Sequence, residues 1–119
     1  MRPETANILA ILDAYTFPSS ENIAKAISDD FRQRRIEKGI TREAMAEKSG
    51  VPLASIARFE QKGLISLNSL IALAMALGYL GEVKNIFSEP KFDTMEELAL
   101  IRRNTGKKKA SSRKPKKDK

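Results

Sequence analysis

The 119-residue sequence has no cysteine, no histidine and no tryptophan, and its aromatic residues are five phenylalanines and two tyrosines. Without cysteine there is no disulfide framework and no thiolate metal site. Without histidine the commonest general base and the usual zinc ligand are also missing. No constellation of acid, base and nucleophile stands out among the other residues. We therefore expect no enzyme, no metal and no cofactor, and a core built from aliphatic side chains.

Long apolar segments are also missing. The longest uninterrupted run, residues 70–77, is eight residues, whereas a membrane-spanning helix needs about 20. The first 17 residues mix a short apolar stretch with Glu4, Asn7 and Asp13, a pattern unlike that of a signal peptide. We expect a cytoplasmic protein.

Positive charge is unevenly distributed along the chain. Ten of the 22 Lys and Arg residues lie from Arg102 onward, where Asp118 is the only acidic residue, so this end carries +9 and the remainder −2. Residues 31–62 are an exception within that remainder, because they hold eight basic and four acidic residues. A basic segment within a folded region is a better indication of a nucleic-acid surface than a basic tail.

Apolar residues recur at helical spacing, and no strand-like alternation is present, so the sequence predicts an all-α fold. We expect a first helix over residues 4–15. A second helix should be capped by Ser20 and run to Lys38, with Ile23, Ile27 and Phe31 on one face and Gly39 beyond its end.

Further helix boundaries follow from Ser, Thr and Gly positions. Thr41 should cap a helix over 42–49, Ser66 one over 67–77, and Thr94 with Glu97 should form a capping box for a last helix to about 103. Helices over 52–61 and 80–87 complete the set, and Gly50, Gly63 and Gly78 end helices. The helix over 67–77 should turn an inner face to the core, formed by Leu67, Leu70, Ile71, Ala74 and Leu77.

The most informative stretch is residues 41–63, TREAMAEKSGVPLASIARFEQKG. It predicts two short helices joined at Gly50, which should have a positive φ, with the small Ala46 allowing close approach. This is the helix-turn-helix layout, whose second helix enters the DNA major groove. The side chains expected to face inward are Met45, Val51, Ile56 and Phe59.

The wider segment 31–80 resembles the lambda-repressor/Cro-type, or Xre-family, helix-turn-helix domain. The matching residues are Arg35, Gly39, Ile40, Thr41, Met45, Ala46, Gly50, Val51, Ile56, Glu60, Gly63 and Gly78. The narrower stretch VPLASIARFEQKGLISLNSL is similar to the Hip-type antitoxins encoded beside HipA-like kinases. The resemblance implies a compact five-helix domain that binds double-stranded DNA as a homodimer, and the narrower one implies a HipA-like kinase toxin as partner.

The outer face of the second helix of the motif should contact DNA bases through Leu53, Ala54, Ser55 and Arg58. An Arg can bond to guanine O6 and N7, while Leu and Ala suit thymine methyl groups. Arg42, Lys62 and Ser66, at helix ends, are expected phosphate contacts. The alternatives are a solvated or ion-paired role for the charged residues and simple capping for Ser66.

Two further sets have structural interpretations. The resemblance implies that Arg35 and Glu60 form an ion pair that ties two helices together. Arg32 and Arg34 are expected to face solvent, with a phosphate contact as the alternative. Several apolar residues exceed what so short a segment buries alone, so they form either a dimer interface or a contact with the N-terminal helix; they are Tyr79, Leu80, Val83, Ile86 and Phe87. The same alternatives apply to Phe92, Met95, Leu98 and Ile101.

The sequence thus predicts an N-terminal helical extension (1–19), a DNA-binding domain (20–88), a C-terminal helical extension (89–103) and a disordered basic tail (104–119). The tail has three interpretations: non-specific DNA affinity, a protein contact, or a solubilising end. For the whole chain we expect a dimeric repressor of its own operon and an antitoxin. The alternatives are a phage or mobile-element repressor without a toxin, and a protein-binding inhibitor with weak DNA binding.

Overall fold

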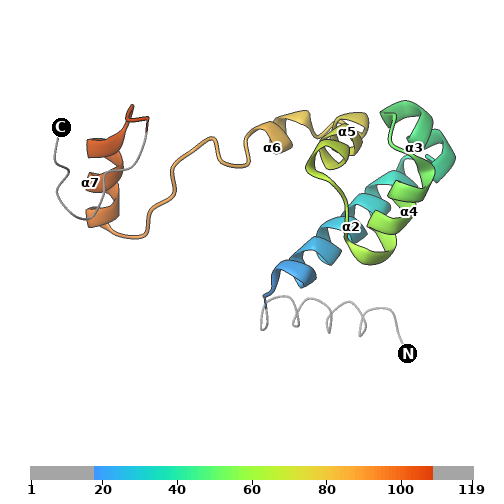
Figure 1. Ribbon diagram of the computed structural model, residues 1–119, viewed down its shortest axis with the longest axis horizontal. Helices are drawn as coiled ribbons and strands as arrows, with labels where there is room; N and C mark the ends of the chain where they lie inside the picture. The colour runs from blue at the N-terminus through green and yellow to red at the C-terminus, as the bar shows by residue number, and fades with distance from the viewer. Residues whose placement is uncertain (1–17, 109–119) are drawn as a thin grey trace. The chain divides into compact units, whose positions relative to one another are not determined.

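The computed structural model describes residues 18–108, so the helix expected over residues 4–15 and most of the expected tail lie outside the described residues. Within this range the chain forms six α-helices and no strand, which confirms the all-α prediction. The helices are α2 (Ser20–Glu37), α3 (Arg42–Ser49), α4 (Leu53–Lys62), α5 (Leu67–Leu77), α6 (Leu80–Lys84) and α7 (Met95–Asn104) (Figure 1). The chain divides into two compact units, one ending at Val83 and the other beginning at Lys84.

Hydroxyl side chains cap four of the helices. Thr41, Ser66 and Thr94 each accept a hydrogen bond from the backbone N–H three residues later, as predicted. The prediction for α2 was wrong by one residue, because Ser19 rather than Ser20 is the cap. Ser19 has an extended backbone (φ −130°, ψ 160°) and accepts from Asn22 N at 3.1 Å, whereas Ser20 is already helical. Two adjacent serines offer the same cap chemistry, and the backbone conformation decides between them.

Other helix ends also differ slightly from expectation. Helix α2 ends at Glu37, with Lys38 as its C-cap. Helix α4 begins and ends one residue later than predicted, because Pro52 takes the N-cap position with ψ 145°. Helix α6 ends at Lys84 instead of reaching residue 87, and α7 ends at Asn104. These shifts leave the order of elements unchanged.

Glycines end the helices of the motif in the left-handed conformation. Gly50 has φ +80° and Gly63 has φ +71°, as expected of residues that close helices. Gly63 has a second role that its sequence position did not predict. A Cβ there would lie 3.1 Å from both the carbonyl carbon of Ala24 and the backbone N of Lys25, so the chain after α4 passes directly against α2.

The core of the first unit lies between α2, α3, α4 and α5. Helix α2 packs on α4, and α3 packs on both α4 and α5. The rings of Phe31 and Phe59 meet with centroids 5.5 Å apart and planes tilted by 54°, a favourable aromatic geometry. The inward positions predicted for the motif are confirmed, since the buried apolar residues are Phe31, Met45, Val51, Ile56, Phe59, Leu73 and Leu77.

The predicted inner face of α5 was partly wrong. Leu73 and Leu77 are buried and Leu70 packs against the core, whereas Leu67 is 67% exposed. Because α5 is apolar almost all round, its sequence is compatible with more than one inward stripe. On α2, Ile23 and Ile27 share a face with Phe31, but only Phe31 is buried, and Ile27, one turn earlier, is 46% exposed.

Candidate nucleic-acid interface

The turn between α3 and α4 is held by three hydrogen bonds. Gly50 N donates to Ala46 O at 2.8 Å. The Ser49 hydroxyl donates to Met45 O at 2.7 Å and accepts from Val51 N at 3.1 Å. Val51 and Met45 are buried on either side of this turn. The angle between the two helices is thus set by both packing and backbone bonds, which gives α4 a defined orientation.

Helix α4 has one buried and one exposed face. Ile56, Phe59 and Glu60 are buried. On the exposed side, Leu53 is 41% exposed, Ala54 and Arg58 are exposed, and Ser55 is half-buried. The structure therefore brings together all four residues expected to contact bases. It adds Gln61, also exposed and three residues after Arg58, which i, i+3 spacing could have identified from the sequence.

The start of α4 has no side-chain cap. Pro52 makes no side-chain cap, and Ser55 N and Ile56 N both bond to its carbonyl, at 2.9 and 3.1 Å. The first turn of α4 thus presents backbone N–H groups that no side chain caps. Such a helix start is electropositive and suits an anionic partner.

The two cations of α4 are available to a ligand. Neither Arg58 nor Lys62 forms an ion pair or a side-chain hydrogen bond with any residue that the structure describes. Arg58 lies on the exposed face, and Lys62 is in the last turn. Their donors are therefore free to bind DNA bases or phosphates.

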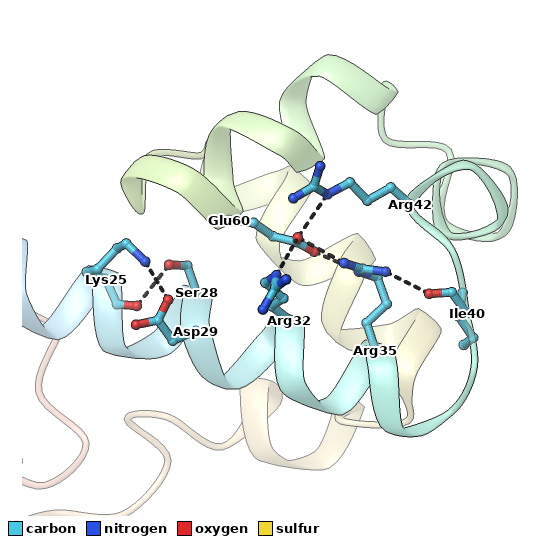
Figure 2. Close-up of polar contacts among 8 residues, drawn as sticks. All are labelled: Lys25, Ser28, Asp29, Arg32, Arg35, Ile40, Arg42 and Glu60. Carbon is cyan, nitrogen blue, oxygen red and sulfur yellow. Dashed lines mark hydrogen bonds and ion pairs between the residues drawn. The ribbon is translucent and has the colours of Figure 1, made fainter. Parts of the chain in front are cut away.

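Glu60 is buried and holds α2, α3 and α4 together (Figure 2). Arg35 donates to it from Nε to Oε2 at 2.7 Å and from Nη2 to Oε1 at 3.0 Å. Arg42, at the start of α3, donates from Nε to Oε1 at 3.0 Å. Arg32, one turn before Arg35, lies with Nε 3.9 Å from the same oxygen. The expected pair of Arg35 and Glu60 is therefore part of a four-residue cluster.

The cluster explains the ionisation of Glu60. Burial raises the pKa of this carboxyl group, but hydrogen bonds from Arg35 and Arg42 and the charges of both arginines outweigh it. The net result is a pKa below the ordinary value, so Glu60 is ionised at neutral pH.

The structure adds contacts to two arginines singled out from the sequence. Arg42, an expected phosphate contact, donates to Glu60 while its side chain stays 35% exposed. Arg32 is 54% exposed, as expected of a solvent-facing residue, and also lies near Glu60. Arg34 is half-buried and pairs with Glu37 at 2.9 Å. The i, i+3 spacing of Arg32 and Arg35 could have indicated that Arg32 also approaches Glu60. The approach of Arg42 depends on tertiary structure.

Ser66 and the expected interface residues lie outside this cluster. The Ser66 hydroxyl caps α5 by accepting from Ser69 N at 3.1 Å and remains exposed. Tyr79 and Leu80 are exposed and Val83 is half-buried. In the second unit Ile86 and Phe87 are exposed, Phe87 by 93%. Helix α7 buries none of its residues; Phe92 and Met95 are exposed, and Leu98 and Ile101 are half-buried.

Residues 18–108 contain neither a metal-binding cluster nor a membrane-spanning helix. No group of three or more carboxylates there is arranged to hold a metal ion. None of the described helices has the length and apolar character required to cross a membrane.

Comparison with known proteins agrees with this geometry. Residues 31–82 match the helix-turn-helix family. This stretch is just under half of the chain and includes all of α3, α4 and α5. The match supports the Xre-type resemblance and indicates a DNA-binding transcription regulator. Neither a curated protein nor a solved structure matches the chain.

Proposed function

We propose that this protein is a sequence-specific DNA-binding repressor that acts as a homodimer and regulates its own operon. The observation that carries the proposal is the exposed face of α4, which is rigidly set by α3 and carries Arg58 without any described protein partner. An unpaired Arg on the outer face of a second motif helix suits the major groove.

The contacts divide into two sets. Leu53, Ala54, Ser55 and Arg58 read bases, with Arg58 bonding to a guanine. Arg42, Lys62 and Ser66 contact phosphates and fix the register of the domain on the duplex. Two copies related by a two-fold axis would place their α4 helices in successive major grooves, about 34 Å apart, on an inverted repeat.

We further propose that residues 20–88 form the DNA-binding domain and that exposed apolar side chains near its end and in α7 mediate protein contacts. The support is the exposure of apolar side chains outside the first unit, including Ile86, Phe87 and Met95 at 59%, 93% and 73%. Neighbouring exposed apolar residues such as Ile86 and Phe87 supply surface that a protein partner could cover. The occupants proposed are the second copy, through the segment from Tyr79 to Phe87, and a HipA-like kinase toxin.

A second candidate function is a protein-binding inhibitor with weak DNA affinity. The observation that favours it is the apolar start of α4, where Leu53 is 41% exposed beside Ala54. Apolar residues discriminate between bases less well than paired amide or guanidinium groups. Weak operator binding together with tight binding of a protein partner would favour this function.

The test is a fluorescence-anisotropy titration of the full chain against the DNA upstream of its own gene, with random duplex of equal length, at two salt concentrations. Autorepression predicts strong preference for the upstream DNA with one dimer per inverted repeat. Arg58→Ala should cost about 1–3 kcal/mol on the upstream DNA and little on random DNA. Arg34→Ala removes the same charge from the exposed side of α2 and should leave the preference unchanged.

Equal loss on both DNAs would make Arg58 a phosphate contact. Equal and steeply salt-dependent binding of the unmodified protein to both DNAs would argue against sequence-specific repression of this operon. A toxin partner is tested separately, by co-expression with any HipA-like kinase encoded next to the gene. Absence of such a gene would favour the mobile-element repressor.

A further inference from the structure

Three guanidinium groups from two helices converge on one buried carboxylate. Arg32 and Arg35 come from α2 and Arg42 from the first turn of α3, and all three approach Glu60 Oε1 within 4 Å. The side chain of Glu60 is 1% exposed. One negative charge therefore faces three positive charges, and the cluster keeps a surplus of two.

The uncompensated positive charge lies on the two solvent-accessible arginines, Arg32 and Arg42. Arg35 is nearly buried and fully used, since Nε and Nη2 bond to Glu60 and Nη1 donates to Ile40 O at 2.8 Å. The side chain of Arg42 is 35% exposed and that of Arg32 54% exposed. Each of these two faces Glu60 through Nε alone. Among the described residues, none accepts a hydrogen bond from their Nη groups.

Glu60 thus orients the Arg42 guanidinium by a hydrogen bond and attracts that of Arg32 by charge at 3.9 Å, while the Nη donors of both stay free. A guanidinium has five N–H donors in a planar fork that matches the paired oxygens of a phosphate group. Arg42 is also the first residue of α3, whose N-terminal N–H groups favour an anion. Because Arg42 is already held by its bond to Glu60, binding an anion would cost it less conformational entropy than ordering a free arginine.

We propose that Arg32 and Arg42 together bind a single phosphate of the DNA backbone, and that Glu60 holds Arg42 in position for it. The inference rests on the proposed DNA-binding function and adds to it Arg32, a shared phosphate and a reason for the third arginine at Glu60. In this arrangement Arg42 keeps its Nε bond to Glu60 while its Nη groups bind the phosphate, and Arg35 keeps the buried carboxylate paired.

The test uses the full chain and random duplex DNA, because a phosphate contact is independent of sequence. Dissociation constants are measured over a salt series for the unmodified protein, Arg32→Ala, Arg42→Ala and the double variant. Each single variant should bind roughly tenfold more weakly, and the double variant clearly less than 100-fold more weakly, because both residues act on one phosphate. The slope of log K against log salt should fall by about 0.9 in the double variant, the value for one phosphate.

Two further variants separate this geometry from bulk charge. Arg34→Ala removes one charge from the same helix and should change neither affinity nor slope. Arg42→Lys keeps the charge but loses the fork and the Nε donor, so it should bind about as weakly as Arg42→Ala. In ¹H–¹⁵N spectra the Nε–H signals of Arg32 and Arg42 should shift when DNA is added, while that of Arg35 stays in place.

The outcomes separate the inference from the proposed function. An unmodified protein that binds no DNA would overturn both. An unmodified protein that binds DNA, with Arg32→Ala indistinguishable from Arg34→Ala, would overturn the shared phosphate alone. So would a slope that falls by about 1.8 in the double variant, since that is the value for two separate phosphates.

Discussion

Replacing Glu60 with Gln tests how much the arginine cluster stabilises the fold. Gln has nearly the shape of Glu but no charge, and one of its two terminal atoms is a donor. That donor would face the N–H groups of Arg35 or Arg42, which now donate at 2.7 to 3.0 Å. Arg35 would then be a nearly buried cation without a carboxylate.

The expected loss is about 3 kcal/mol in the free energy of unfolding. This is the lower end of the range for breaking a buried ion pair from one side, and it fits the loss of one or two charged hydrogen bonds. For a domain of this size such a loss lowers the melting temperature by roughly 10–20 °C. Urea unfolding followed by circular dichroism at pH 7 would show a lower midpoint with an unchanged slope.

The pH dependence gives an independent check. The pKa of Glu60 in the folded protein is lowered from its ordinary value of 4.5. Its charge therefore contributes stability that is complete above the ordinary pKa and is lost as the pH falls through the folded pKa. The difference between the unmodified protein and Glu60→Gln should be constant from pH 8 to about 5 and should narrow as the pH falls below that.

Glu37→Gln is the matched control, because Glu37 also pairs with an arginine, Arg34, but on the exposed side of α2. It should leave the midpoint unchanged within error. If Glu60→Gln destabilises no more than Glu37→Gln, the cluster does not hold α2 to α4, and the apolar core does so alone.

Two further predictions concern the turns and caps. Gly63→Ala and Gly50→Ala both place a side chain at positive φ, but only at Gly63 does the new Cβ meet backbone, that of Ala24 and Lys25 at 3.1 Å. The positive φ alone should lower the stability of each variant by about 1 kcal/mol. Gly63→Ala should be destabilised clearly more because of the added backbone contact. Equal urea midpoints for the two variants would disprove the close approach. Ser19→Ala should cost about 1 kcal/mol as loss of an N-cap, and Ser20→Ala should cost much less. The opposite order in thermal unfolding would restore Ser20 as the cap.

The connection between fold and function lies in α4. Its inner residues Ile56 and Phe59 fill the core, and Glu60 ties it to α2 and α3. The outer face of α4 therefore contributes little to the stability of the fold. Changes such as Arg58→Ala should alter DNA binding without altering stability. Glu60 is the exception, because it serves the fold and, in our proposal, the phosphate contact together.

Local chemistry determined much of the first unit from the sequence alone. Thr41 and Ser66 begin helices because their hydroxyls accept from backbone N–H groups, and Gly50 and Gly63 end them because only glycine adopts positive φ without strain. The buried side of α4 also followed from the sequence, because polar residues separate its apolar positions at helical spacing and allow one inward face.

Only the tertiary structure decided what depends on neighbours far along the chain. The nearly uniform apolar surface of α5 permitted several orientations, and contact with α3 selected the one that buries Leu73 and exposes Leu67. Ile23 and Ile27 match Phe31 in spacing but stay 44% and 46% exposed, because the chain after α4 meets α2 at Ala24 and Lys25 and not on their face. Arg42 meets Glu60 although 18 residues separate them. Periodicity describes one helix at a time, whereas these features depend on where one helix ends against another.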